Sequence, residues 1–263
     1  MKMSHRYSDT RWLVLSDIHV PYHFEPLMAA ALELARDVKF DGCILNGDVL
    51  DLIEITHHNA GSVKALEGKR IAHTFAAGNR LLDRLDDALP PKAEKFFLAG
   101  NHEDRWDRWI ASGDNAVWAD DEVNSIPGRL HLEDRGWEWR GNYPEAHVML
   151  GKLLVTHGQW AGMHCAKKHL DEYQTSCLVG HTHTDQTHHA STWEGQRVCH
   201  CAGYMGDPTK ESFDYKKRPR RWVQGFTVVT VARDGAFWIQ PIRWWDGKFV
   251  FGAQTYPKKA RRK

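Results

Sequence analysis

The stretch "KFFLAGNHEDRWDRW", residues 95–109, changes character halfway along its length. It starts as a short apolar run, breaks at Gly100 into Asn101, His102 and Glu103, and then repeats Asp-Arg-Trp twice. A strand that looks fully buried but ends in an amide, an imidazole and a carboxylate has two explanations. It is either an ordinary strand-to-helix turn or one wall of an active site, and the other strand ends of the chain distinguish between these.

The segments around this stretch alternate between expected strands and expected helices. Apolar runs ending in polar residues predict strands at 11–19, 42–51 and 95–103, and helical composition predicts helices at 25–40 and 65–89. Pro26 suits the first turn of the first helix, and Pro90 stops the second. A further helix is expected to start at Asp104. This alternation predicts an α/β domain built in layers.

The second half of the chain has mainly strand patterns. Two apolar runs around Gly151 and Lys152 predict a hairpin, and residues 176–184 predict one more strand that ends in histidines. Residues 221–245 predict a hairpin of a second, more antiparallel sheet. The irregular segment 112–142 is expected to form a cap or long loop over the site. We see no long internal repeat and no dividing linker, so we expect residues 1–263 to form a single domain, with a basic tail at 257–263.

Composition excludes several classes of protein. With 42% hydrophobic and 26% charged residues, the chain can build a packed core and is not globally disordered. The net charge of +1 creates no overall electrostatic field that would attract nucleic acid or a membrane surface, although basic clusters lie at 215–221 and 257–263. No apolar run approaches the ~18 residues that span a bilayer. The N-terminus lacks the apolar core of a signal peptide, so we expect a cytoplasmic protein without a membrane partner.

The cysteines do not indicate a functional site, whereas the histidines do. The five cysteines are odd in number and show no CxxC spacing, which argues against a disulfide framework. The alternation in Cys199-His200-Cys201 favours a strand with both thiols on one face over a metal site. The 17 histidines are unusual, and several lie at predicted strand ends, where parallel-sheet proteins place their chemistry.

Five strand ends carry side chains of the kind that bind metal ions. They are Asp17 and His19 in "SDIH", Asp48 in "NGDVLD", Asn101 and His102 in "GNHE", His157 in "VTHG", and His181 and His183 in "GHTH". Singly, each has an ordinary explanation, because Gly-Asp is a common turn dipeptide and His-x-His can be a solvated face. Together, each after a short apolar run, they indicate a shared site. Imidazole and carboxylate suit Mn²⁺, Fe, Zn²⁺ or Ni²⁺, and thiolate is absent from the set.

This set of motifs resembles the calcineurin-like metallophosphoesterases, over residues 13–184. The resemblance rests on Asp17-Ile18-His19, Gly47–Asp51, Gly100–Glu103, His157-Gly158 and Gly180–His183. It implies a four-layer α/β/β/α sandwich of two mixed sheets flanked by helices, with a two-metal centre between the sheets. It also implies that one metal is bound by Asp17, His19 and His183, the other by Asn101, His157 and His181, and that the Asp48 carboxylate bridges them.

The same resemblance implies a mechanism and roles for two more residues. Two divalent ions about 3.5–4 Å apart can hold a bridging hydroxide as nucleophile and clamp the phosphoryl oxygens. Mn²⁺ is the favoured ion, with Fe, Zn, Ni or Mg as alternatives. His102 is not needed as a ligand, so it would face the substrate and protonate the leaving oxygen or stabilise charge. Asp51 would orient His102, the alternative being a cap of the next segment.

Residues that contact the substrate are expected after the GNHE motif. Arg105 is a candidate for phosphate contact together with Asn101 and His102, whereas a helix-surface charge pair is the favoured explanation for Arg108. Trp106 and Trp109 are expected in the core. Where the protein phosphatase branch of the family has Arg and Gly, this chain has Leu52 and Ile53, which does not favour phosphoprotein substrates. Further histidines could line the pocket. For His57, His58, His188 and His189 a position in solvated loops is favoured, and His164 could lie near the cleft.

Three functions remain open at this point, and oligomeric state is left open as well. The favoured one is a phosphodiesterase or nuclease acting on nucleic acid or nucleotides, because basic clusters bind backbone phosphate and tryptophans stack on bases. The second is a phosphomonoesterase acting on small nucleotides or phosphoproteins, which the compact length and the lack of a DNA-binding appendage favour. The third, a non-catalytic binding protein on the same fold, is disfavoured by the complete ligand set and His102.

Overall fold

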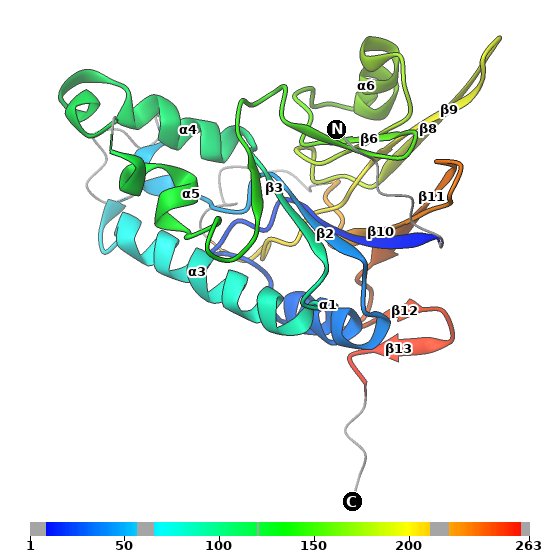
Figure 1. Ribbon diagram of the computed structural model, residues 1–263, viewed down its shortest axis with the longest axis horizontal. Coiled ribbons are helices and arrows are strands. Elements are labelled where there is room, and N and C mark those ends of the chain that lie inside the picture. Colours follow the sequence, from blue (N-terminus) through cyan, green and yellow to red (C-terminus); the bar gives the residue numbers. More distant parts are fainter. Residues whose placement is uncertain (1–8, 57–65, 120, 211–220, 259–263) are drawn as a thin grey trace, which may run out of the picture.

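A computed structural model describes residues 9–56, 66–119, 121–210 and 221–258 of the chain (Figure 1). The chain forms two mixed sheets that pack face to face, with helices on the outer face of each sheet. Figure 1 shows α1 (Glu25–Val38) and α3 (Ile71–Ala88) beside the first sheet, and α6 (Cys165–Tyr173) beside the second. The predicted four-layer α/β/β/α architecture is confirmed.

The first sheet has the strand order β11-β10-β1-β2-β3-β4. Its strands are β1 (Thr10–Leu15), β2 (Gly42–Asn46), β3 (Glu94–Leu98), β4 (Glu138–Arg140), β10 (Gly225–Val231) and β11 (Phe237–Arg243). Strands β1 to β4 run parallel, whereas β10 pairs antiparallel with both β1 and β11. Parallel pairing brings the carboxyl ends of β1, β2 and β3 to one edge of the sheet.

The hairpin β10–β11 corrects the prediction that residues 221–245 belong to the second sheet. It extends the first sheet instead, because β10 lies next to β1. The reason is burial: all but one residue of β10 is buried, with Phe226 and Val228 facing the helix side and Val229 facing the other sheet. A strand that is apolar on both faces is stabilised most when both faces are covered.

The second sheet has the strand order β5-β6-β7-β9-β8. Its strands are β5 (His147–Leu150), β6 (Leu153–Thr156), β7 (Cys177–Val179), β8 (Gln186–Thr192) and β9 (Gly195–Cys201). The predicted hairpin is confirmed, since β5 and β6 pair antiparallel around Gly151, whose φ is 60°. Strands β6 and β7 run parallel, so their carboxyl ends also share one edge.

The helices begin and end for identifiable reasons. Pro26 lies in the first turn of α1, and α3 ends before Pro90, both as predicted. Helix α4 (Asn101–Ile110) begins three residues before the predicted start at Asp104, because the Glu103 side chain accepts the Gly100 N–H and caps the helix there. The remaining elements are short: η1 (Ile53–Ile55), η3 (Gly113–Trp118), η4 (Glu122–Asn124), α5 (Ile126–Arg129), β12 (Phe249–Phe251) and β13 (Gln254–Tyr256).

Three apolar clusters fill the three interfaces of the sandwich. The largest lies between the first sheet and helices α1 and α3, and includes Leu13, Leu45 and Phe97. The second joins the two sheets, and the third lies between α6 and the second sheet. Cys199 and Cys201 both belong to that third cluster, which confirms that the two thiols lie on one face of β9.

The segment 112–142 is partly built into the domain. Ile126, Leu130 and Trp137 are buried in the largest cluster, and Trp106 Nε1 donates a hydrogen bond to the Asn124 carbonyl at 2.8 Å. Its suggested role as a cover over the site stays a prediction.

The basic tail is described only as far as Lys258, which forms an ion pair with Asp37 at 2.5 Å. Asp37 lies in the last turn of α1, which runs away from the carboxyl ends of the parallel strands. Residues 259–263 lie outside the described residues, as do 215–220 of the other basic cluster. Within the described ranges, no helix is long and apolar enough to cross a membrane.

Candidate metal centre

The seven predicted metal ligands all follow strands whose carboxyl ends meet between the two sheets. Asp17 and His19 follow β1, Asp48 follows β2, Asn101 follows β3, His157 follows β6, and His181 and His183 follow β7. The structure brings these side chains together into two adjoining groups, described in turn below.

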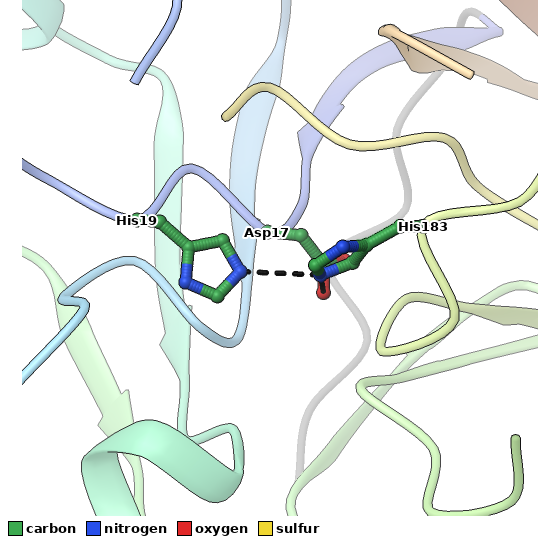
Figure 2. A group of neighbouring side chains, drawn as sticks. All are labelled: Asp17, His19 and His183. Atoms are coloured by element: carbon green, nitrogen blue, oxygen red, sulfur yellow. Dashed lines mark hydrogen bonds and ion pairs between the residues drawn. The ribbon is translucent and has the colours of Figure 1, made fainter. Parts of the chain in front are cut away.

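The first group consists of Asp17, His19 and His183 (Figure 2). The Nε2 atoms of the two imidazoles lie 3.2 Å apart, and His183 Nε2 lies 3.2 Å from Asp17 Oδ1. Figure 2 shows the His19 and His183 rings approaching from opposite sides, with the Asp17 carboxylate drawn against the His183 ring. All three residues are buried. Two imidazole nitrogens and a carboxylate oxygen that converge in this way form a donor set suited to a divalent transition metal.

The second group lies around the amide of Asn101. Its Oδ1 lies 2.7 Å from His181 Nδ1 and 3.3 Å from His157 Nε2. Asp48 Oδ2 lies 3.4 Å from His157 Nε2, and the Asp48 carboxylate also groups with His19 of the first set. Asp48 therefore lies between the two groups, as the predicted bridging position requires.

Neighbouring backbone carbonyls and carboxylates orient the imidazoles. His157 Nδ1 lies 2.8 Å from the Asn46 carbonyl, which holds a proton on Nδ1 and turns Nε2 toward Asp48 and Asn101. In the same way, His19 Nδ1 lies 3.2 Å from Asp51 Oδ2. Both contacts hold the imidazole in the tautomer and orientation that metal binding needs.

Asp51 contacts His102 differently from the prediction. Its carboxylate contacts His19, whereas its backbone carbonyl contacts His102, at 2.5 Å from Nδ1. The reason is a backbone bridge between Val20 and Leu50, in which the Asp51 N–H donates to the Val20 carbonyl at 3.0 Å. This bridge places the Asp51 side chain against the β1 loop that carries His19.

The backbone is strained at most of these positions. Left-handed φ angles occur at Asp17 (54°), His19 (57°), Asp48 (50°), His181 (67°) and His183 (57°). Such conformations of non-glycine residues cost about 1–3 kcal/mol each and persist where the surrounding structure imposes them. Strain of this kind gathers at functional sites, and here it coincides with the predicted ligands.

Two glycines of the motifs pack so closely against the carboxylates of the site that no side chain fits at their positions. A Cβ on Gly100 would lie 2.3 Å from Asp48 Oδ1, and a Cβ on Gly180 would lie 2.0 Å from Ser16 Oγ and 2.7 Å from Asp17 Oδ2. Any side chain at these positions would displace Asp48 or Asp17. The glycines of the GNHE and GHTH motifs thus allow the carboxylates to sit where they do.

Glu103 holds the turn that carries Asp48 in place. This fully buried carboxylate accepts four backbone N–H groups at 2.9 Å, from Gly100, Asp48, Val49 and Leu50. It joins the start of α4 to the turn that carries Asp48. The GNHE motif alone does not reveal this role, because the Glu103 side chain reaches backbone N–H groups of residues 53–55 positions earlier in the chain.

Burial and neighbouring charges shift the pKa values of the cluster. Burial would raise the pKa of Asp48, but His102 and His157 hold it well below its usual value. Burial would lower the pKa of His157, yet the Asp48 carboxylate raises it to about 10. For His181 and His102 burial dominates and lowers the pKa to about 4. In the metal-free protein at neutral pH, the His181 and His102 rings are therefore uncharged, whereas the His157 ring carries a second proton and a positive charge.

The predicted substrate contacts of α4 have other partners in the structure. Arg105 Nη1 donates to the carbonyls of Asp51 at 3.2 Å and Leu52 at 3.3 Å. Arg108 pairs with Asp104 at 2.8 Å one helical turn away, which confirms the surface pairing favoured for it. Trp106 is buried as predicted, but Trp109 is 38% exposed because it lies on the outer side of α4, so its core prediction is wrong.

The additional histidines are distributed over three places. His188 and His189 lie on strand β8, not in a loop, because β8 pairs antiparallel with β9 along this stretch. His164 directly precedes α6 and lines a cavity together with His188. His57 and His58 lie outside the described residues.

Comparison with protein families matches residues 10–225 to the model of the calcineurin-like phosphoesterases. Three solved structures have similar folds. They are Vacuolar Protein Sorting 29 from Cryptosporidium parvum (13% identity, TM-score 0.48, 95% of this chain and 100% of that chain), a metallophosphoesterase from Sphaerobacter thermophilus (18%, 0.42, 90% and 88%) and the phosphoesterase Yfce from E. coli (16%, 0.36, 86% and 96%). No curated protein gives a significant match.

Proposed function

Since the chain belongs to the calcineurin-like phosphoesterase family, we propose that it is a metal-dependent phosphodiesterase acting on nucleotides or nucleic acid. The observation that carries the proposal is the convergence of imidazole, carboxylate and amide groups from both sheets. His19 and His183 meet at 3.2 Å on one side of Asp48, and His157 lies 3.4 Å from Asp48 on the other. Their donor atoms suit divalent transition metals.

The proposed metal centre assigns each group of side chains to one ion. Asp17, His19 and His183 would hold the first ion, Asn101, His157 and His181 would hold the second, and the Asp48 carboxylate, which groups with both sets of histidines, would be shared between them. When bound, the ions would act as Lewis acids on the phosphoryl group and lower the pKa of a water nucleophile. Mn²⁺ is the favoured ion, and Fe, Zn, Ni or Mg are the alternatives.

His102 is the proposed proton donor or charge stabiliser. Its Nδ1 donates to the Asp51 carbonyl at 2.5 Å, so Nε2 is the ring atom left for the substrate, and the ring can donate from Nε2 only after taking up a second proton, which the nearby Asp48 carboxylate favours. That atom lies 3.7 Å from Asp48 Oδ2, and the His102 ring lies 4.7 Å from the His19 ring. The His102 side chain is 17% exposed, so it can reach an incoming ester. Asp51 then acts through two contacts, with its carbonyl positioning His102 and its carboxylate positioning His19.

The environment of Arg105 favours a diester over a monoester. A phosphomonoester carries about −1.5 to −2 charge at neutral pH, whereas a diester carries one negative charge. Arg105 Nη1 donates to the carbonyls of Asp51 and Leu52, so this nitrogen is not available to bind a further phosphate oxygen. A site that relies on metal ions and neutral histidines matches the smaller charge of a diester.

The placement of the basic clusters refines the nucleic-acid hypothesis. Lys258, at the start of the tail, pairs with Asp37 at the end of α1 that lies away from the site. Arg221, in contrast, is followed by Trp222, whose ring centroid lies 4.5 Å from that of His183. We therefore propose that Arg221, and not the tail, meets the substrate.

The test compares three substrates with the same protein. Chelator-treated protein is supplied with Mn²⁺ and given p-nitrophenyl phosphate, bis-p-nitrophenyl phosphate or single-stranded DNA. We expect turnover of the diester and of DNA, and loss of both in the Asp48→Asn variant. A preference for the monoester would instead assign a phosphomonoesterase for small nucleotides or phosphoproteins. No turnover with Mn²⁺, Fe²⁺, Zn²⁺, Ni²⁺ or Mg²⁺ would leave a binding protein on a phosphoesterase fold.

A further inference from the structure

A cavity of about 460 Å³ lies between the start of α6 and the segment that joins β7 to β8. Residues on its wall include Met163, His164, Lys167, Gln186, His188 and Arg221. Cavities of roughly 300–1,000 Å³ are the size that small organic ligands occupy in proteins. None of these residues belongs to the proposed metal centre, so the cavity has no role in the function described so far.

Two residues that line the cavity lie, in the chain, directly beside the proposed metal ligand His183 or beside a residue that packs against it. Thr184 lines the cavity and directly follows His183 in the chain. On the other side, the Val223 N–H donates to the His183 carbonyl at 2.9 Å, and the Trp222 ring packs against the His183 ring. Arg221, which lines the cavity, immediately precedes this pair. The cavity therefore adjoins the two segments that carry His183 and the ring packed against it.

The walls are held in place by contacts within the protein. The Cys165 thiol donates to Gln186 Oε1 at 3.2 Å and lies 3.9 Å from Thr184 Oγ1, which ties the first turn of α6 to the strand segment. Asp185 forms an ion pair with Arg243. Because its oxygen already accepts a hydrogen bond, Gln186 presents its amide nitrogen as the remaining donor. The cavity is thus preformed.

The chemistry of the lining matches a heteroaromatic group that is attached to a phosphate. His164 and His188 supply flat rings, and Met163, which is 61% exposed, supplies a polarisable thioether. Gln186 can hydrogen-bond to the edge of a base. The exposed Arg221 adds a cation at the side nearest His183. Stacking surfaces combined with a cation are the features that bind nucleotides without strict sequence preference.

We propose that this cavity binds the nucleoside esterified to the phosphate that the metal centre holds. This inference rests on the proposed phosphodiesterase function and specifies its substrate class. It predicts that the protein distinguishes esters by the organic group on the phosphate, and that His164, His188 and Arg221 determine this preference without taking part in phosphate hydrolysis.

The test uses two diesters with the same leaving group. Thymidine p-nitrophenyl phosphate and methyl p-nitrophenyl phosphate both release p-nitrophenolate, but only the first has a nucleoside for the cavity. Loss of one stacking contact costs a base about 1–3 kcal/mol, so His164→Ala or His188→Ala should lower kcat/KM for the thymidine ester about fivefold or more. Arg221→Gln should act in the same direction. The methyl ester should change less than about twofold in the His164→Ala and His188→Ala variants, because a contact confined to the nucleoside contributes nothing to it.

His147→Ala is the matched control, because His147 is an exposed histidine on β5, at the opposite edge of the second sheet from β8. It should leave both esters unchanged. Equal losses for both esters, or an unchanged preference in all three cavity variants, would overturn the proposal. If the wild-type protein hydrolyses neither ester, the phosphodiesterase function fails separately. Calorimetric binding of thymidine monophosphate then decides on the cavity: weaker binding in the His164→Ala and His188→Ala variants supports it, and unchanged or undetectable binding refutes it.

Discussion

Replacing Glu103 by glutamine should destabilise the protein far more than an ordinary isosteric change. The Glu103 carboxylate is fully buried and accepts the N–H groups of Gly100, Asp48, Val49 and Leu50, each at 2.9 Å. Glutamine keeps the shape but replaces one oxygen by an NH₂ group. Two of the four N–H donors would then face another donor, and neither could be satisfied by water in a buried site.

The magnitude follows from these contacts. Hydrogen bonds to a charged group contribute about 1.5–3 kcal/mol each, so losing two of them costs about 3–6 kcal/mol, and because the neutral glutamine also escapes the burial cost that raises the pKa of Glu103, we expect a net loss at the lower end of this range. That is a large share of the ~5–15 kcal/mol that typically stabilises a domain. At about 2–4 °C per kcal/mol for a domain of this size, we expect the Tm to fall by about 6 °C or more.

The assay is thermal unfolding of metal-free protein at pH 8, where the carboxylate is ionised because burial raises the pKa of Glu103 only to about 7. Glu54→Gln is the matched control, since Glu54 is a half-buried glutamate that accepts one side-chain hydrogen bond, from Thr74 at 2.7 Å. It should cost about 0.5–1.5 kcal/mol. A Tm loss in Glu103→Gln no larger than in this control would refute the structural role assigned to Glu103.

Three further changes test the site itself. Gly180→Ala should lower the metal content of purified protein, because the new Cβ would lie 2.0 Å from Ser16 Oγ; full metal content by mass spectrometry would contradict this. His102→Ala should retain metal and lose about 10²–10⁴-fold in kcat, as expected for a lost acid–base group; loss of metal would show that His102 is a ligand. Metal binding at pH 8 should release about one proton, because Asp48 raises the pKa of the buried His157 to about 10 and ligation needs the neutral ring. Calorimetry in buffers of different ionisation enthalpy measures the number of protons released. A heat of metal binding that does not depend on the buffer would refute this prediction.

The candidate site was predictable because its residues lie directly after strands. The carboxyl ends of parallel strands share an edge, so short motifs after β1, β2 and β3 must lie near one another. The motifs after β6 and β7 add His157 and the pair His181 and His183 by the same rule in the second sheet. The chemistry of the side chains then indicated a metal centre before any distance was known.

Other features could not be predicted, because they depend on contacts between distant parts of the chain. The pairing of β10 with β1 joins Thr10 to Val231, and no local pattern selects that edge over the second sheet. The Asp51 carboxylate contacts His19 because a backbone bridge joins Val20 to Leu50. The cavity beside α6 likewise combines segments that lie far apart in the sequence.

The most direct test of the central claim is anomalous diffraction from crystals soaked in Mn²⁺. We expect two peaks about 3.5–4 Å apart on either side of the Asp48 carboxylate, the usual spacing of a two-metal site. One peak should be bound by His19 and His183, and the other by His157 and His181. No peak at these side chains at saturating Mn²⁺, or a single peak bound elsewhere in the protein, would contradict the account.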